Sequence, residues 1–234
     1  MSLRVGVIGV GYLGQHHARV FSGLEGVELV GVADQDSKRA GEIAKTYGCR
    51  SFAGHADLVG ICDVLSIVTP TTSHHAIAMD CLNAGRDLFI EKPITERLDE
   101  AREIIEAAEK NNLILQVGHL ERYNPGILAA MGMIKSPKFI EAERLSPFLG
   151  RALDVDVTLD LMIHDIDIVL SIVGSKVKEI RATGERVLTG RLDAAKAWLE
   201  FENGCQALLT ASRLATDKKR MLKVHQEGSY ISID

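Results

Sequence analysis

Short apolar runs and longer stretches with helical periodicity alternate along the first 120 residues. The apolar runs are rich in β-branched residues and are apolar on both faces, which is typical of parallel strands buried on both sides. Because strands that alternate with helices form βαβ crossovers, the pattern predicts an α/β domain with a doubly wound parallel sheet. The predicted strands cover residues 3–10, 27–33, 64–68, 87–90 and 113–117, and the predicted helices cover residues 13–22, 37–47, 75–84 and 98–110.

The pattern changes after about residue 120. Two stretches with helical spacing, residues 125–134 and 158–172, flank a predicted strand at residues 138–145. Farther on, apolar and polar residues alternate with a period of two, which is typical of strands with one covered face. These predicted strands cover residues 196–201, 206–211, 221–226 and 230–233, with a hairpin turn at Asn203-Gly204.

We therefore expect two domains. Residues 1–120 form the domain with the parallel sheet, and residues 121–234 form an α+β domain with a mainly antiparallel open sheet. Because the sequence ends inside a predicted strand, we expect the second domain to be incomplete at its C-terminus.

Composition narrows the class of protein. Of the 234 residues, 46% are hydrophobic and 25% charged, which is typical of a globular protein. The net charge of −5 gives no basic surface for nucleic acid or an anionic membrane, so we expect a small-molecule partner. The sequence contains no apolar run long enough for a membrane span and no signal peptide, which predicts a cytoplasmic protein. The cysteines have neither C-x-x-C spacing nor nearby paired histidines, so we expect reduced thiols and no metal site: Cys49, Cys62, Cys81 and Cys205.

A glycine-rich motif lies between the first predicted strand and the first predicted helix. In this position a G-x-G-x-x-G turn lets the backbone approach a pyrophosphate at the helix N-terminus. Asp34, twenty residues after Gly14 at the end of the second predicted strand, can accept hydrogen bonds from an adenosine ribose and repel a 2′-phosphate. We therefore predict a Rossmann domain that binds NAD. NADP is less expected because of this repulsion, although two cations in residues 35–39 weaken the preference. The alternative is a simple tight turn. The motif is Gly9-Val10-Gly11-Tyr12-Leu13-Gly14.

Polar loops follow the next two predicted strands. Ligands of open α/β sheets bind at this carboxyl edge, so we expect Thr69, Pro70, His74 and Glu91 to contribute to the wall of the cofactor site. For the His74-His75 pair, helix capping or packing is a better interpretation than metal binding, because no carboxylate or third histidine is near. Lys92, placed by a proline turn that can be cis, is suited to lie beside the nicotinamide and to bind a substrate oxygen, although a lone lysine is more often a surface residue.

Asp160 and His164 have i, i+4 spacing in the predicted helix 158–172 and so share one helix face. A carboxylate that orients an imidazole suits the removal of a proton from an alcohol. The alternative is a polar pair without a catalytic role.

Together and in this order, these motifs resemble those of the Gfo/Idh/MocA oxidoreductases, which include glucose-fructose oxidoreductase and myo-inositol dehydrogenase. The resemblance implies a Rossmann domain followed by a domain with a broad open sheet, often used to form homo-oligomers; here we expect a dimer or tetramer. It also implies hydride transfer between NAD(P) and the hydroxyl-bearing carbon of a sugar. Lys92, Asp160 and His164 match the family's catalytic positions, and the choice of base between Lys92 and His164 stays open.

A narrower resemblance lies in residues 118–125 and 144–148. These segments are similar to those of the family branch that oxidises C3 of UDP-N-acetylglucosamine or a related nucleotide sugar. Guanidinium groups can bind a pyrophosphate, so we expect Arg122 and Arg151 to bind the substrate, with Arg144 as a further candidate. Tyr123 and Asn124 are expected to form hydrogen bonds with the sugar or the uracil. The alternatives are ordinary surface arginines with an Asn-Pro helix start, a polyol or free-sugar dehydrogenase, or a non-catalytic NAD-binding sensor.

Overall fold

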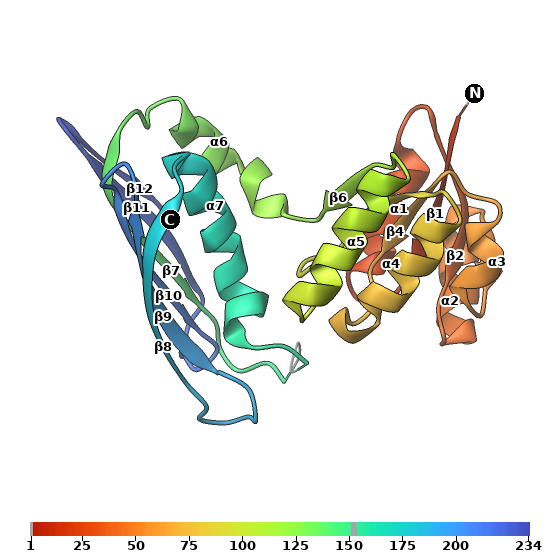
Figure 1. Ribbon diagram of the computed structural model, residues 1–234. Coiled ribbons are helices and arrows are strands. Elements are labelled where there is room, and N and C mark those ends of the chain that lie inside the picture. Colours follow the sequence, from red (N-terminus) through yellow and green to blue (C-terminus); the bar gives the residue numbers. More distant parts are fainter. Residues whose placement is uncertain (1, 151–153) are drawn as a thin grey trace. The chain divides into compact units, whose positions relative to one another are not determined.

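The chain folds as two compact units, residues 1–118 and 119–234 (Figure 1). The computed structural model describes residues 2–150 and 154–234. Each unit has its own sheet, with one apolar core in the second unit and one on each face of the sheet in the first. Within the described part of the chain, no helix has the length and apolar character needed to cross a membrane.

A six-stranded parallel sheet forms the first unit. Its strand order, β3-β2-β1-β4-β5-β6, reverses direction at β1, so that β1 and β4 flank the switch point at which ligands of such sheets bind. This topology confirms the predicted doubly wound fold. The strands are β1 (Leu3–Ile8), β2 (Val27–Ala33), β3 (Arg50–Phe52), β4 (Val64–Ile67), β5 (Asp87–Ile90) and β6 (Leu115–Val117).

Helices cover both faces of this sheet, and alternate residues of a strand therefore enter different cores. On β1, Val7 packs in a core with Ala18 and Ala44, whereas Ile8 packs in a second core with Leu82 and Ile104. The helical elements are α1 (Gly14–Gly23), α2 (Ser37–Tyr47), α3 (His55–Val59), the 3-10 turn η1 (Thr71–Ser73), α4 (His74–Asn83) and α5 (Leu98–Lys110).

The second unit contains an open six-stranded sheet of order β12-β11-β7-β10-β9-β8. Its neighbouring strands are antiparallel except for the parallel pair β7 and β10, which confirms the mainly antiparallel sheet. The strands are β7 (Pro137–Leu145), β8 (Val177–Glu185), β9 (Ala194–Phe201), β10 (Gln206–Ser212), β11 (Lys219–Gln226) and β12 (Ser229–Ile233).

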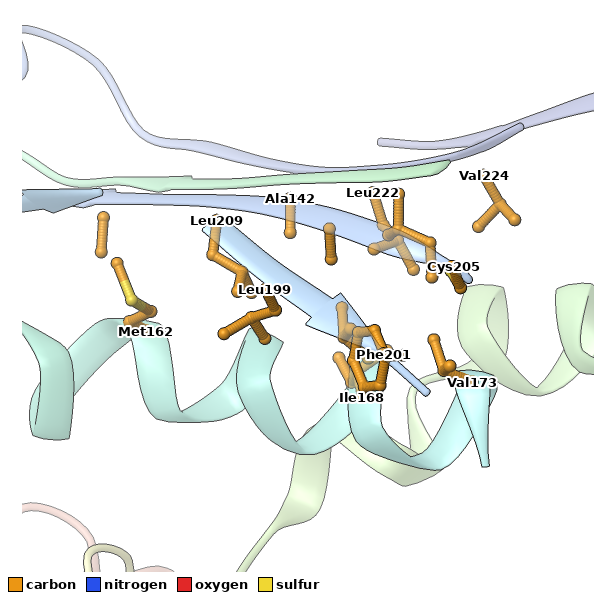
Figure 2. Close-up of a cluster of buried hydrophobic side chains, with 14 of the residues drawn as sticks. Ala142, Met162, Ile168, Val173, Leu199, Phe201, Cys205, Leu209, Leu222 and Val224 are labelled. Carbon is orange, nitrogen blue, oxygen red and sulfur yellow. The ribbon is translucent and has the colours of Figure 1, made fainter. Parts of the chain in front are cut away.

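One face of this sheet is covered by helix α7 (Ile163–Val173), and the core lies between them (Figure 2). Leu199, Phe201 and Leu209 of the sheet meet Ile168 and Val173 of α7 in this core. The other helical elements of the unit are the 3-10 turn η2 (Leu120–Tyr123), α6 (Pro125–Met131) and the π-helical turn η3 (Thr158–Met162), which runs into α7.

The largest differences between the structure and the predicted elements lie in three places. Strand β3 and helix α3 were not predicted, because three and five residues are too few to show a period. Strand β8 was not predicted either: seven of its nine residues are exposed, so it lacks the alternation of a strand with one covered face. The helix predicted at residues 158–172 begins with a π-helical turn instead of α-helix.

Candidate functional site

The glycine turn after β1 shows which glycines the fold itself requires. Gly9 has a φ of +85°, and a Cβ there would lie 2.7 Å from the carbonyl oxygen of Val68. A Cβ on Gly14 would lie 1.8 Å from the carbonyl oxygen of Gly9. A Cβ on Gly11, in contrast, would meet only the Arg39 Nη1 atom, at 3.7 Å. The fold thus tolerates a side chain at position 11, and a glycine there leaves space for close approach of a ligand.

Asp34 is oriented by this turn. Its Oδ2 accepts from the Val10 amide at 2.8 Å and its Oδ1 accepts from the Asp36 amide at 2.9 Å. A carboxylate has about four acceptor positions, so both oxygens retain capacity for ribose hydroxyls. Asp34 lines a cavity of about 630 Å³, a size suited to a cofactor, whose lining includes Gly9, Gly11, Arg39, Thr69 and Pro70.

The N-terminus of α1 also fits a bound pyrophosphate. Among the described residues no side chain caps α1, whereas the side chain of Asp36 caps α2 by accepting from the Arg39 amide. Tyr12 and Leu13 lie in the turn before α1 and are exposed, with the Tyr12 ring edge-on to His16. Their predicted contact with the cofactor stays a prediction. The uncapped helix and the open space at Gly11 together suit a dinucleotide.

Glu91 lies behind the turn that carries Lys92. Its Oε1 is 3.1 Å from His17 Nε2, and its Oε2 accepts from the Lys92 amide at 3.1 Å. A Cβ on Gly118 would lie 2.9 Å from Glu91 Oε1, so a glycine at 118 leaves room for this buried carboxylate. Lys92 itself is half-buried, and its peptide bond to Pro93 is cis.

His74 joins two loops at the carboxyl edge of the sheet. Its Nε2 is 2.9 Å from the Thr69 carbonyl oxygen and its Nδ1 is 3.0 Å from that of Pro93. The ring is buried, which agrees with the packing interpretation of this histidine. The residues that the structure describes contain no group of three His, Cys, Asp or Glu side chains that could hold a metal ion.

In the second unit, Asp160 lies in η3 and His164 in the first turn of α7. Both side chains are half-buried. The π-helical turn is closed by the Ile163 amide, which donates to the Thr158 carbonyl oxygen. Functional sites often contain such turns.

The chain segment that leads into η3 is held by buried polar groups. Arg213 Nη2 donates to the Val155 carbonyl oxygen at 2.9 Å, and Asp156 Oδ1 accepts from the Leu192 amide at 2.8 Å. Asp193 is fully buried and accepts from three successive amides, those of residues 187–189. Burial opposes the charge of Asp193, but the bonds from the Thr189 hydroxyl and these amides prevail and hold its pKa below the ordinary value.

The structure pairs the expected substrate-binding arginines with carboxylates of α7. Arg122 donates through Nε and Nη2 to Asp167, at 2.6 and 2.7 Å. The buried Arg144 donates to Asp165 through the same two nitrogens, with a shortest distance of 2.8 Å. These contacts favour an anchoring role for both arginines, while a role in substrate binding stays a prediction.

The other predicted substrate contacts have mixed surroundings. The Asn124 side chain accepts from the Gly126 amide at 2.9 Å and caps α6, which supports the Asn-Pro helix start. Tyr123 is exposed. Arg151 lies outside the described residues.

Sequence reasoning missed His17, Ser66 and the two carboxylates Asp165 and Asp167. A helical signal for His17 exists: it lies three residues after Gly14 and next to Ala18, both of which are buried. Its partners were not predictable, because Ser66 and Glu91 lie 49 and 74 residues away in the sequence.

Known proteins share both units of this chain. Residues 3–119 match the family model described as "Oxidoreductase family, NAD-binding Rossmann fold", and residues 135–231 match the "GFO/IDH/MocA C-terminal domain". The chain belongs to the Gfo/Idh/MocA oxidoreductase family. This membership confirms the predicted NAD-binding Rossmann domain and the predicted oxidoreductase class.

Members of the Gfo/Idh/MocA family differ in their similarity to this chain. UDP-N-acetylglucosamine 3-dehydrogenase from Acidithiobacillus ferrooxidans is 40% identical over 99% of this chain and 74% of its own length. A solved structure of that dehydrogenase has a TM-score of 0.93, with 39% identity over 100% of this chain and 77% of its own chain. The NAD(+)-dependent scyllo-inositol 2-dehydrogenase of Bacillus subtilis is 28% identical over 90% of this chain and 67% of its own length.

Proposed function

We propose that this protein is an NAD-dependent dehydrogenase of a nucleotide sugar, with C3 of UDP-N-acetylglucosamine or of a related compound as the oxidised carbon. The observation that carries the proposal is the 40% identity with a UDP-N-acetylglucosamine 3-dehydrogenase over nearly the whole chain. The scyllo-inositol 2-dehydrogenase of Bacillus subtilis is 28% identical over 90% of this chain. The glycine turn, Asp34 and the uncapped helix α1 support the use of NAD.

The residues proposed for the chemistry are Lys92, Asp160 and His164. When bound, NAD supplies the acceptor for the hydride that leaves the sugar carbon. His164, oriented by Asp160, takes the proton of the sugar hydroxyl, and Lys92 holds the same oxygen and shares the proton transfer. Residues 1–118 thus serve the cofactor, and residues 119–234 serve substrate binding and oligomerisation.

The test measures NADH formation by its absorbance, in the presence of saturating NAD and UDP-N-acetylglucosamine. Product analysis by mass spectrometry identifies a 3-keto sugar nucleotide. His164→Asn and Lys92→Met should each lower kcat by about 10²- to 10⁴-fold while NAD still binds, because each removes a group that moves the proton. Retention of kcat within about threefold in either variant would remove that residue from the mechanism.

A polyol or free-sugar dehydrogenase is the second candidate function, favoured by the similarity to the scyllo-inositol 2-dehydrogenase. The two functions differ in their response to UDP. A nucleotide-sugar enzyme should bind UDP in competition with its substrate, whereas an inositol enzyme should oxidise myo- or scyllo-inositol and ignore UDP. NAD binding without turnover of any of these compounds would favour an NAD-binding sensor.

The exposed residue Tyr123 provides the cleanest test of the proposed substrate contacts, which also include Arg122, Asn124 and Arg151. Among the four, Arg122 and Asn124 already bond within the protein, so that their substitution also disturbs the fold. Tyr123→Phe removes only a hydroxyl and should raise KM for the nucleotide sugar without a change in thermal stability. An unchanged KM would exclude the Tyr123 hydroxyl as a contact.

We further propose that the protein forms homo-oligomers through the sheet face opposite α7. Phe139 on β7 packs against Trp198 on β9, with ring centroids 5.6 Å apart, and against His225 on β11 at 5.7 Å. Tyr230 on β12 extends this aromatic group. Aromatic residues are enriched in interfaces, so Trp198→Lys should convert a dimer or tetramer to smaller species in sedimentation velocity.

A cytoplasmic location is proposed from the state of the cysteines. All four are unpaired and buried or half-buried. Burial raises the pKa of Cys62 to about 11 and that of Cys81 to about 12, so both are protonated thiols at neutral pH. Fractionation of the host cells, with a cytoplasmic marker enzyme, tests this location.

A further inference from the structure

Two histidines contact the turn of residues 91–94, which carries Lys92: His17 is half-buried and His74 is buried. On one side His17, in α1, contacts Glu91, and Glu91 accepts from the Lys92 amide. On the other side His74, at the start of α4, contacts the carbonyl oxygens of Pro93 and Ile94 at 3.0 and 3.2 Å. Each histidine also reaches a further element, so the turn is tied to more than its own strand.

The first of these links is a directed chain of hydrogen bonds. A carboxylate only accepts, so His17 Nε2 carries the hydrogen that it donates to Glu91. His17 Nδ1, 2.9 Å from Ser66 Oγ, then accepts from the serine hydroxyl. The side chains of His17 and Glu91 are only 13% and 8% exposed, so water competes little for these bonds.

These three residues have the composition of a hydrolase triad, but their burial excludes that role. Ser66 is fully buried within the sheet, and a nucleophile must reach a substrate. The His17 ring is packed edge-on against Phe89 at 5.5 Å, which fixes its plane. This series of hydrogen bonds therefore ends at the Lys92 amide, so that it affects the position of Lys92.

We propose that His17 and His74 are positioning residues that hold Lys92 in place, His17 through Glu91 and His74 through the carbonyl oxygens that follow Lys92. The inference deepens the proposed function, because it rests on the role of Lys92 given there. His17 belongs to the helix that begins at the glycine turn, and His74 also contacts Thr69 in the cofactor cavity. The two links thus connect the Lys92 turn to α1 on one side and to the Thr69 loop, which lines that cavity, on the other.

Each positioning histidine has a neighbour that serves as a matched control. His16 is exposed and touches Tyr12, and His75 is half-buried and contacts Glu103 at 2.7 Å. His17→Leu and His74→Leu should lower kcat by about 10- to 100-fold, the cost of a displaced catalytic group. For His17→Leu, NAD affinity should stay within about threefold. His16→Leu and His75→Leu should leave kcat unchanged.

Conservative variants separate positioning from general loss of structure. His17→Gln retains a donor toward Glu91 and should recover most of the kcat lost in His17→Leu. In Glu91→Gln the side-chain oxygen of the glutamine can accept from the Lys92 amide, and its NH₂ group can donate to His17 Nε2. The ring of His17 then carries its hydrogen on Nδ1, which donates to Ser66 Oγ. Glu91→Gln should therefore keep kcat within about threefold, and Glu91→Leu should not.

A measurement on the protein without substrate decides the inference even if no sugar is turned over. The reaction of lysines with trinitrobenzenesulfonate, followed by peptide mass spectrometry, compares Lys92 with the exposed Lys110. Loss of either link should speed modification of Lys92 by at least about threefold, because the turn opens more often, while Lys110 stays constant. Equal rates in wild type, His17→Gln, Glu91→Gln and the leucine variants that fold would overturn the inference.

Discussion

A buried ion pair anchors α7, and its removal should destabilise the second unit specifically. Arg144 on β7 and Asp165 on α7 are only 7% and 8% exposed in their side chains. Three hydrogen bonds of 2.8 to 3.2 Å join them. Asp165→Ala leaves the Arg144 guanidinium buried without this partner, and the penalty for an uncompensated buried charge is about 3–5 kcal/mol.

The surroundings of Arg144 set the expected value within that range. Glu121 Oε2 lies 3.5 Å from Arg144 and stays as a second, weaker counter-ion. We therefore expect Asp165→Ala to lower the free energy of unfolding by about 3 kcal/mol, the lower limit of that range. With a urea m-value of about 2 kcal/mol/M for a unit of this size, the unfolding midpoint should fall by about 1.5 M.

Fluorescence of Trp198 is the assay for this change. Trp198 is the single tryptophan of the chain and lies on β9, so its signal in urea reports unfolding of the second unit. Asp167→Ala is the matched control, because its partner Arg122 is 49% exposed and water can solvate that guanidinium. The free energy of unfolding of Asp167→Ala should be only about 1 kcal/mol below that of the wild type.

The double variant Arg144→Met/Asp165→Leu provides the decisive comparison. When both charges are replaced by apolar groups, no buried charge is left alone, and stability should return to within about 1 kcal/mol of the wild type. The reasoning is refuted if Asp165→Ala loses less than about 1 kcal/mol. It is equally refuted if the double variant is as unstable as Asp165→Ala.

Three further predictions follow from local geometry. Gly11→Ala should fold normally and weaken NAD binding in a calorimetric titration, whereas Gly14→Ala should lower the melting temperature of the first unit, because its Cβ meets a carbonyl oxygen. Asn124→Ala should cost about 1 kcal/mol in urea unfolding, because it removes the cap of α6. The lowered pKa of Asp193 stabilises the fold above its unfolded pKa of about 3.9, so stability should fall as the pH decreases below about 4, and less so in Asp193→Asn.

In both units, the sequence predicts best those elements that are buried on both sides or strongly periodic. The helices of residues 37–47 and 98–110 have the predicted bounds, since each has one apolar face. Strand β8 has no covered face, so its pairing with β9 leaves no trace in the pattern of hydrophobic residues. The parallel pairing of β7 with β10 was equally hidden, because register depends on partners far apart in the sequence.

In the candidate site, too, residue spacing predicts some features, whereas others depend on hydrogen-bond partners far apart in the sequence. G-x-G-x-x-G and Asp34 were predictable, since a turn and a strand end place them by local rules. The surroundings of Glu91 were not: its carboxylate meets His17 and the Lys92 amide, and nothing in the local sequence distinguishes it from a residue that faces the cofactor. Hydrogen-bond partners across 74 residues are a property of the fold.

The acidic residues of α7 show how the structure sharpens the choice of catalytic groups. By spacing alone, the segment offers three carboxylates near His164, namely Asp160, Asp165 and Asp167. The structure assigns Asp165 to the buried Arg144 and Asp167 to Arg122, both through short bonds to the guanidinium groups. Those carboxylates anchor α7 to its unit, and Asp160 stays the acid that we propose to orient His164. Loss of activity in Asp160→Ala should therefore come without the instability expected of Asp165→Ala.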